Sequence, residues 1–167
     1  MSKKILLTGA TGMIGGLVLD IALKDGQISE VVSLVRKPSS VKNPKLKEII
    51  VSDFLDYSSI ESQLEAVDVV FYCLGVYTGK AAKDEFRKIT VDFPAALAKA
   101  VIQHSPNARF CLLSGQGADR TEKSAIQFAK DKGAIENILS GMGFAGFYSL
   151  RPSYIYPVTP RKEPNFT

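Results

Sequence analysis

Short apolar runs recur along the chain and are separated by longer, more polar stretches. Each run is too short for a helix and is rich in β-branched or aromatic residues, which is typical of strands. The runs are continuously apolar, and continuous runs indicate strands that are buried on both faces of a parallel sheet. Six such strands are predicted, at Ile5–Leu7, Val31–Val35, Ile49–Val51, Val69–Leu74, Phe110–Leu113 and Phe147–Leu150.

Helical periodicity fills most of the intervals between these runs. Apolar residues repeat at helical spacing from Ile14 to Ile21, and Gly26 follows as a stop signal. Longer helical patterns cover Asp84–Gln103 and Ser124–Ser140. Strands that alternate with helices predict an α/β fold, a doubly wound (Rossmann) parallel sheet with helices on both faces.

Two connections have weaker patterns. Ser58 and Glu61 have the spacing of a capping box, which predicts a short helix that reaches about Ala66. The stretch RKPSSVKNPK, residues 36–45, contains two prolines, so a loop is expected there in place of a crossover helix. With 167 residues and no repeat, linker or low-complexity tract, the chain is expected to form one domain, residues 1–167.

Four glycines lie within eight positions of LLTGATGMIGGLVL, where the first strand meets the first helix. A tight turn there requires positive φ or the absence of a Cβ, and Gly9, Gly12 and Gly15 meet that need. Backbone N–H groups at the helix start can then hold a pyrophosphate at close range. The spacing differs from the usual G-x-G-x-x-G fingerprint, but its place in a β-α-β unit predicts dinucleotide binding.

The end of the second predicted strand indicates which dinucleotide is bound. NAD-selective sites place an acidic side chain there for the ribose 2′-hydroxyl. This chain has Arg36 and Lys37 instead, which attract a 2′-phosphate. NADP(H) is therefore expected to be preferred over NAD(H), and the alternative is that the two cations belong to a solvated loop.

The net charge, the N-terminal sequence and the lengths of the apolar runs disfavour several classes of protein. The net charge of +4 is modest and the basic residues are scattered, which disfavours a nucleic-acid partner. No secretory signal is visible, and no apolar run approaches the roughly 18 to 20 residues needed to span a bilayer. A soluble, cytoplasmic protein that does not bind membranes is expected.

Candidate metal ligands are scarce. Cys73 and Cys111 lie in apolar runs without partners at metal-ligand spacing, and the expected state is two reduced core thiols. His104 is the single histidine, which disfavours a Ser/His/Asp triad or a histidine-rich metal site.

Several short segments resemble the short-chain dehydrogenase/reductase superfamily. They are TGATGMIG, YCLG, GKA at 79–81, LLSGQGAD, KGAIE and LRP, and they occur in the family order from Lys3 to about Pro152. Within that superfamily the chain is similar to the small atypical members grouped with the Tat-interacting oxidoreductase-like protein and the NmrA-like proteins. The resemblance implies an NADP(H) site in which Asp53 and Phe54 flank the adenine and Leu74 and Gly75 pass beneath the cofactor. It also implies a pyrophosphate cradle of Thr8, Gly9, Ala10, Thr11, Gly12, Met13, Ile14 and Gly15, with Arg36 and Lys37 at the 2′-phosphate.

The catalytic part of the resemblance is incomplete. Carbonyl-reducing members use a serine at the end of the fifth strand and a Tyr-x-x-x-Lys on the following helix, where the lysine lowers the pKa of the tyrosine. Ser114 and Lys132 match the serine and the lysine, and Lys132 is also expected at the nicotinamide ribose. The residue four before Lys132 is Phe128, which has no proton to give. Four tyrosines are candidate substitutes, Tyr72, Tyr77, Tyr154 and Tyr156, and of these Tyr77 and Tyr154 lie on predicted loops near the carboxyl ends of strands.

Simpler roles compete for the same residues. Lys132 fits a surface position, Ser114 fits a loop cap, and Phe128 fits core packing. If Phe128 does stand at the tyrosine position, its ring is predicted on the same helix face as Lys132 and opposite Ser114. If the family resemblance is left aside, Asp53 is interpreted as an acidic residue in a turn after a strand.

Two functional classes remain open. The first is an NADPH-dependent reductase without the usual tyrosine, acting on carbonyl, quinone-like or flavin-like acceptors. The second is a binding module in which NADP(H) occupancy controls contact with a partner protein. Family members usually continue past the LRP strand with elements that shape the substrate pocket, so a minimal pocket is expected here and the substrate is not predicted.

Overall fold

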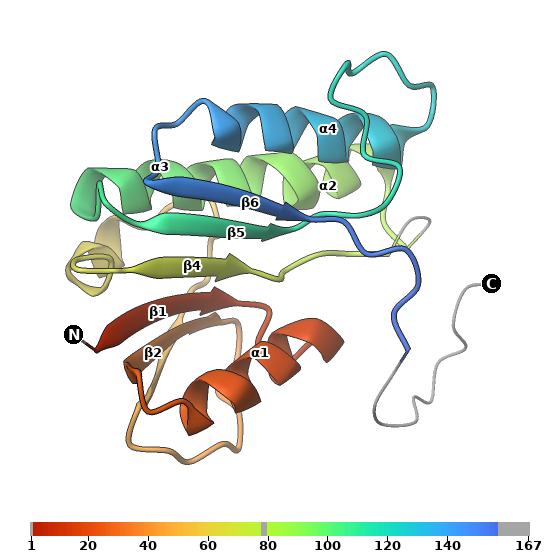
Figure 1. The fold of residues 1–167 in the computed structure, drawn as a ribbon. Helices are drawn as coiled ribbons and strands as arrows, with labels where there is room; N and C mark the ends of the chain where they lie inside the picture. Colours follow the sequence, from red (N-terminus) through yellow and green to blue (C-terminus); the bar gives the residue numbers. More distant parts are fainter. Residues whose placement is uncertain (1, 78–79, 157–167) are drawn as a thin grey trace.

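A six-stranded, fully parallel sheet forms the centre of the molecule in the computed structural model, which describes residues 2–77 and 80–156. Its strand order is β3-β2-β1-β4-β5-β6 (Figure 1), the doubly wound order with its switch point between β1 and β4. All six predicted strands are confirmed. They are β1 (Lys3–Thr8), β2 (Ile28–Val35), β3 (Leu46–Ile50), β4 (Val69–Tyr72), β5 (Arg109–Leu113) and β6 (Gly146–Leu150).

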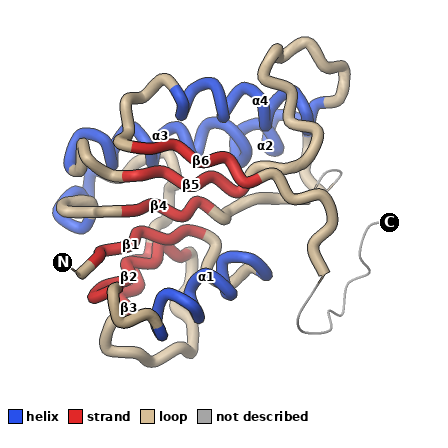
Figure 2. Tube along the Cα trace, viewed as in Figure 1, coloured by secondary structure: helices blue, strands red, loops and turns tan. Residues whose placement is uncertain are grey.

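Helices cover both faces of the sheet, as predicted. Helix α1 (Met13–Lys24) lies on one face, and α2 (Lys83–Arg87), α3 (Phe93–His104) and α4 (Gln127–Ser140) lie on the other (Figure 2). The register places Thr8 opposite both Leu34 and Tyr72. The carboxyl ends of the three central strands therefore meet at one edge of the sheet.

The predicted helix over 84–103 is present but is not regular. A π-helical segment, Lys88–Asp92, joins α2 to α3, and Pro94 stands in the first turn of α3. Proline has no N–H to donate to the carbonyl four residues earlier, at Thr90, and its ring crowds that carbonyl. The wider turn accommodates Pro94 without ending the helix.

The predicted capping box is wrong. Residues Ser58–Gln63 form a 3₁₀ helix, and no side chain caps its first turn. The carboxylate of Asp56 accepts the Ser58 N–H at 2.9 Å, so an Asx turn begins the segment in place of a serine cap. Helix α4 likewise starts at Gln127, later than the expected Ser124, because the Ser124 hydroxyl accepts the Ile126 N–H and holds a turn there. The loop expected over 36–45 is confirmed.

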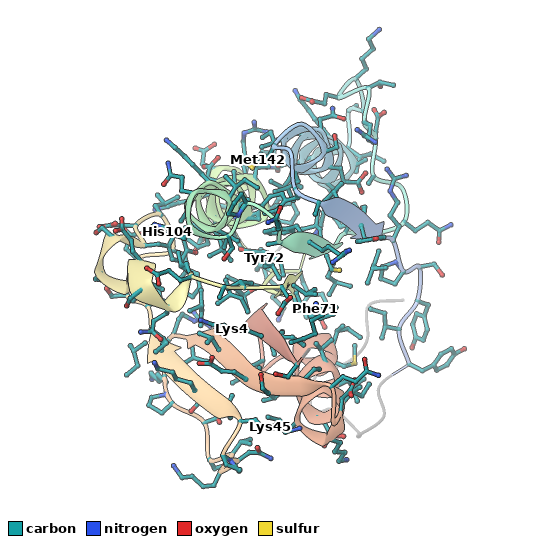
Figure 3. All side chains as sticks on the ribbon, turned by 60° about the vertical axis from the view of Figure 1, so that its left-hand side comes forward. Lys4, Lys45, Phe71, Tyr72, His104 and Met142 are labelled. Atoms are coloured by element: carbon teal, nitrogen blue, oxygen red, sulfur yellow. The ribbon has the colours of Figure 1, made fainter. Side chains whose placement is uncertain are left out.

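Two apolar cores separate the layers. The larger lies between the sheet and α3 and α4 and contains Tyr72, with Met142 packed against it; the smaller lies under α1, where Phe71 packs. The labelled side chains of Phe71 and Tyr72 leave β4 on opposite faces (Figure 3), as alternation along a strand requires. The two cores pack against both faces of the sheet and fix the positions of the strands. The loops that follow the carboxyl ends of the strands lie together at one edge of the sheet.

Candidate cofactor and active site

The glycine turn between β1 and α1 is closed by contacts that exclude larger residues. Gly9 has φ +75°, and a Cβ on it would lie 2.7 Å from the carbonyl carbon of Cys73. A Cβ on Gly15 would lie 2.0 Å from the Gly9 carbonyl oxygen. Glycine is therefore required at both positions, because the first turn of α1 packs directly against the strand ends.

Gly12 differs from the other two glycines. Among the described residues, a Cβ there would meet one atom within 4 Å, the Gly9 carbonyl oxygen at 3.1 Å, and Gly12 is exposed. Its own N–H donates to that same oxygen at 2.9 Å. The space beyond Gly12 is therefore open.

The start of α1 is suited to an anion. Gly12 is the N-cap, no described side chain caps the helix, and its first turn holds no acidic residue. The N–H groups of Met13, Ile14 and Gly15 occupy the positions that have no partner within a helix. These donors, with the positive end of the helix dipole, favour a bound pyrophosphate.

A cavity of about 390 Å³ opens beside this turn, between the carboxyl ends of β1 and β2. One wall is the turn itself, and the opposite wall is the end of β2 with its two cations. The lining residues are Gly9, Ala10, Thr11, Leu34, Val35, Arg36, Lys37, Phe54 and Leu74. The structure thus brings together the glycine turn, the basic pair and two of the residues predicted at the adenine and beneath the cofactor.

Several predicted cofactor residues do not line the cavity. Thr8 is buried below the turn, and Gly75 is exposed after β4. Asp53 is exposed, and its carboxylate accepts the Leu55 N–H at 2.9 Å, which is the behaviour of a turn residue. A role for Asp53 at the adenine stays a prediction.

One face of α4 packs against the end of β5. A Cβ on Gly115 would lie 2.5 Å from the ring carbon Cζ of Phe128, so the ring covers the residue after Ser114. The Lys132 Nζ donates to the Leu113 carbonyl at 3.1 Å. Phe128 and Lys132 thus contact Gly115 and Leu113, the residues on either side of Ser114. A place for the Phe128 ring beside the nicotinamide stays a prediction.

The next residue on this face of α4 is Glu136, which sequence reasoning missed. Its carboxylate is 1% exposed and accepts hydrogen bonds from the hydroxyls of Ser114 and Ser149, each at 2.6 Å. Arg151 forms an ion pair with it through Nε at 2.9 Å and through Nη2. Hydrogen bonds from Arg151, Ser114 and Ser149 outweigh the cost of burial and lower the pKa of Glu136 to about 2.

Lys132 is more than a surface lysine. Burial lowers its pKa to about 8, and the attraction of Glu136 opposes that shift. A sequence signal for Glu136 existed, since a glutamate four residues after Lys132 shares its helix face. Its partners Ser149 and Arg151 could not be predicted, because only the strand order brings them there.

The tyrosines fall into two groups. Tyr72 is buried, its hydroxyl has no hydrogen-bond partner among the described residues, and burial raises its pKa well above 10, so it cannot supply a proton readily. Tyr77, Tyr154 and Tyr156 are exposed by 50%, 48% and 81% and lie on the segments that follow β4 and β6. Whether Tyr77 or Tyr154 replaces the missing acid stays a prediction, and Gly79 of the GKA motif lies outside the described residues.

Neither cysteine has the character of a reactive thiol. Both are free and half-buried; burial, with the neighbouring Cys111, raises the pKa of Cys73 to about 11. Across residues 2–77 and 80–156 no group of three or more His, Cys, Asp or Glu side chains could hold a metal ion. No helix in these ranges is long and apolar enough to cross a membrane.

Comparison with known proteins agrees with this geometry. Residues 9–154 match the family model described as NAD(P)H-binding. The protein named FMP52, mitochondrial, of Candida albicans is 32% identical over 157 residues, which are 91% of this chain and 66% of that protein. Its namesake in Emericella nidulans is 29% identical over 90% of this chain and 66% of its own length. The chain thus spans just under two thirds of the length of these relatives.

Solved structures share the fold. A short-chain dehydrogenase from Burkholderia cenocepacia in complex with NADP has a TM-score of 0.76 at 16% identity and covers 96% of this chain and 78% of its own. A short-chain dehydrogenase/reductase from Burkholderia vietnamiensis has a TM-score of 0.70 at 17% identity, over 91% of this chain and 85% of its own. At these identities the likeness concerns the fold alone, and it confirms the short-chain dehydrogenase/reductase-type architecture.

The comparisons correct one expectation. A cytoplasmic location was predicted from the absence of a recognisable targeting signal. The relatives from Candida albicans, Lodderomyces elongisporus and Emericella nidulans are all named as mitochondrial proteins, which contradicts that prediction. Hydropathy and charge at the N-terminus did not carry the information needed to assign a compartment.

Proposed function

Because the chain belongs to the NAD(P)H-binding family, with the fold of the short-chain dehydrogenases/reductases, we propose that it is an NADPH-dependent oxidoreductase that works without the usual catalytic tyrosine. The observation that carries the proposal is the cavity whose walls are the glycine turn and the basic pair Arg36 and Lys37. One wall offers N–H donors to a pyrophosphate, and the other offers cations to a second phosphate. NADP(H) supplies both phosphate groups, and when bound it would supply a hydride.

Preference for NADP(H) over NAD(H) follows from the charge at the end of β2. Arg36 and Lys37 are exposed at the cavity, and none of the described residues that line it is acidic. A guanidinium grips a phosphate through two parallel hydrogen bonds, whereas a ribose hydroxyl gains little from it. Charge-assisted contacts of this kind contribute roughly 1.5–3 kcal/mol, which is at least about a tenfold preference in affinity.

Calorimetric titration with NADPH and NADH tests this preference. The wild-type protein should bind NADPH at least tenfold more tightly, and Arg36→Asp should lose most of that difference by weakening NADPH binding alone. Lys99→Asp is the matched control, because it makes the same charge change at an exposed position on α3, away from the cavity. Equal affinities in the wild-type protein, or an unchanged preference in Arg36→Asp, would contradict the assignment of the basic pair.

A second candidate function is supported by Phe128 and the Ser114–Glu136 hydrogen bond. A carbonyl-reducing site uses the hydroxyls of a tyrosine and a serine as donors. Here Phe128 has no hydroxyl, and the Ser114 hydroxyl donates to Glu136 instead. A module that binds NADP(H) and controls a partner protein needs no such donors. It would bind NADPH as above and leave carbonyl, quinone and flavin acceptors unreduced.

A mitochondrial location is proposed for this chain on the names of its relatives. Fractionation of cells that express a tagged chain tests it. Recovery with mitochondrial markers is expected, and recovery with the cytosolic fraction alone would contradict it.

A further inference from the structure

The hydroxyl of Ser114 already donates its one hydrogen bond to another residue of the protein. It lies 2.6 Å from Glu136 Oε1, and a carboxylate can only accept, so Ser114 is the donor. Arg151 and Ser149 hold the same carboxylate in place. Toward a ligand, Ser114 can therefore accept a hydrogen bond but cannot donate one.

The neighbouring positions on α4 offer charge but no hydroxyl. The ring of Phe128 covers Gly115 and carries no dissociable proton. Lys132 places a half-buried ammonium beside Ser114, with one N–H used by the Leu113 carbonyl. This face of α4 can stabilise negative charge, but within the described residues neither Ser114 nor position 128 offers it an O–H group that could protonate a localised alkoxide.

Aromatic side chains gather on the segment that follows β6. Tyr154 and Tyr156 form a T-shaped pair with ring centroids 4.6 Å apart, and both are exposed. The Gln116 N–H donates to the Pro152 carbonyl at 2.9 Å and ties this segment to the loop after Ser114. In Figure 1 the segment passes beyond the carboxyl ends of the strands, at the same edge as the cavity. Such rings are suited to packing against a flat conjugated ligand.

We propose that the substrate of this site is a quinone, which accepts hydride into a conjugated ring, and not an isolated aldehyde or ketone. The proposal rests on the proposed NADPH-dependent function and names its acceptor. It is carried by three observations: the Ser114 proton donated to Glu136, Phe128 over Gly115, and the exposed tyrosine pair beside the Ser114 loop.

The chemistry explains the selectivity. NADPH would transfer one hydride, two electrons and a proton, to the quinone, which becomes a hydroquinone anion, and NADPH becomes NADP⁺; a proton from water then completes the hydroquinone. The negative charge of that anion is delocalised, with a proton affinity like that of a phenol, whose pKa is about 10. A reduced aldehyde is a localised alkoxide, which is about as basic as hydroxide and far more basic than a phenolate. The hydroquinone anion needs only the nearby positive charge of Lys132 for stabilisation, whereas the alkoxide needs a positioned acid to protonate it.

The test compares menadione with benzaldehyde as acceptors for the full chain. NADPH oxidation is followed by absorbance, with heat-denatured protein as the blank. Both compounds carry an aromatic ring but differ in intrinsic hydride affinity, so the ratio of their rates is interpreted together with its change in the Phe128→Tyr variant below. We expect kcat/KM for menadione to exceed that for benzaldehyde at least about 100-fold, the range that a positioned acid contributes. A benzaldehyde value within tenfold of the menadione value, or no menadione reduction above the blank, would overturn the proposal.

Phe128→Tyr supplies the missing hydroxyl beside Lys132. It should raise the benzaldehyde rate at least tenfold more than the menadione rate. Phe144→Tyr, which adds the same hydroxyl beyond the far end of α4, is the control and should leave the ratio of the two rates unchanged. If Phe128→Tyr raises both rates equally, the missing acid does not determine the acceptor.

Binding is measured separately from turnover. Saturation-transfer NMR should detect menadione on the NADP⁺-loaded protein, and Tyr156→Ala, a change at a side chain 81% exposed, should weaken that binding several-fold. Unchanged binding would contradict the role of the tyrosine pair. NADPH affinity is determined on the same samples: a protein that binds NADPH but does not reduce menadione contradicts the quinone proposal alone, whereas one that fails to bind NADPH contradicts the proposed function first.

Discussion

The glycines of the β1–α1 turn show how much of the site single residues determine. Sequence spacing identified Gly9, Gly12 and Gly15 as one group, and the structure gives them two roles. Gly9 and Gly15 permit close backbone packing, whereas Gly12 leaves space open in front of the helix. Sequence alone could not separate these roles, because they depend on which atoms of Cys73 and Gly9 lie nearby.

Gly12→Val should abolish dinucleotide binding while the fold is kept. In the part of the chain that the structure describes, a Cβ at Gly12 meets only the Gly9 carbonyl oxygen, at 3.1 Å, so the branched side chain would project into the open space that the pyrophosphate needs. Gly26→Val is the matched control, since no atom lies within 4 Å of a Cβ there. Circular dichroism checks the fold and calorimetry checks NADPH binding. A folded Gly12→Val protein with wild-type affinity would show that the turn is structural only.

At the scale of elements, sequence patterns predicted all six strands and the main helices, because period and burial are local signals. They failed at the ends of elements. Asp56 replaced the predicted serine cap at the 3₁₀ helix, and the π segment before Pro94 could not be read from hydrophobic spacing. The position of α4 is likewise fixed by a contact that no pattern shows, between Gly133 and the loop at Asp119.

Gly133→Ala should destabilise the protein through that contact. A Cβ on Gly133 would lie 1.7 Å from the Asp119 carbonyl oxygen, so α4 or the loop must move. Such overpacking costs typically about 1–3 kcal/mol. Gly141→Ala, at the end of the same helix, has its nearest contacts at 3.7 Å and should change stability by less than about 0.5 kcal/mol. Urea unfolding of both variants measures this, and equal midpoints would contradict the close packing of α4.

At the scale of the whole molecule, Glu136 joins three elements that are distant in sequence. It lies on α4, binds Ser114 at the end of β5, and binds Ser149 and Arg151 at the end of β6. This carboxylate decides what Ser114 can offer a ligand, so the catalytic character of the site depends on the assembled sheet. The expectation that residues 1–167 form a single domain stays a prediction.

Glu136 should make stability depend on pH in a defined window. Its pKa is lowered from 4.5 to about 2 in the folded protein, so its contribution is fully present above about pH 5 and is lost as the pH falls toward 2. The shift corresponds to a stabilisation on the order of 3 kcal/mol. Urea unfolding of the wild-type protein and Glu136→Gln between pH 2.5 and 6 isolates this residue, because other carboxylates contribute equally to both proteins. The difference between the two proteins should be largest at pH 6 and should shrink steadily toward pH 2.5; a difference that does not change with pH would contradict the assignment.

The central claim is that the cavity between β1 and β2 receives the adenosine end of NADP(H), and a crystal structure of the protein with NADP⁺ tests it most directly. The pyrophosphate should lie at the first turn of α1, beyond Gly12, with the 2′-phosphate within hydrogen-bond distance of Arg36 or Lys37. Another hollow, of about 570 Å³ and lined in part by His104, lies elsewhere on the protein. NADP⁺ bound in that hollow, or bound beside the glycine turn with its 2′-phosphate away from both cations, would contradict the account.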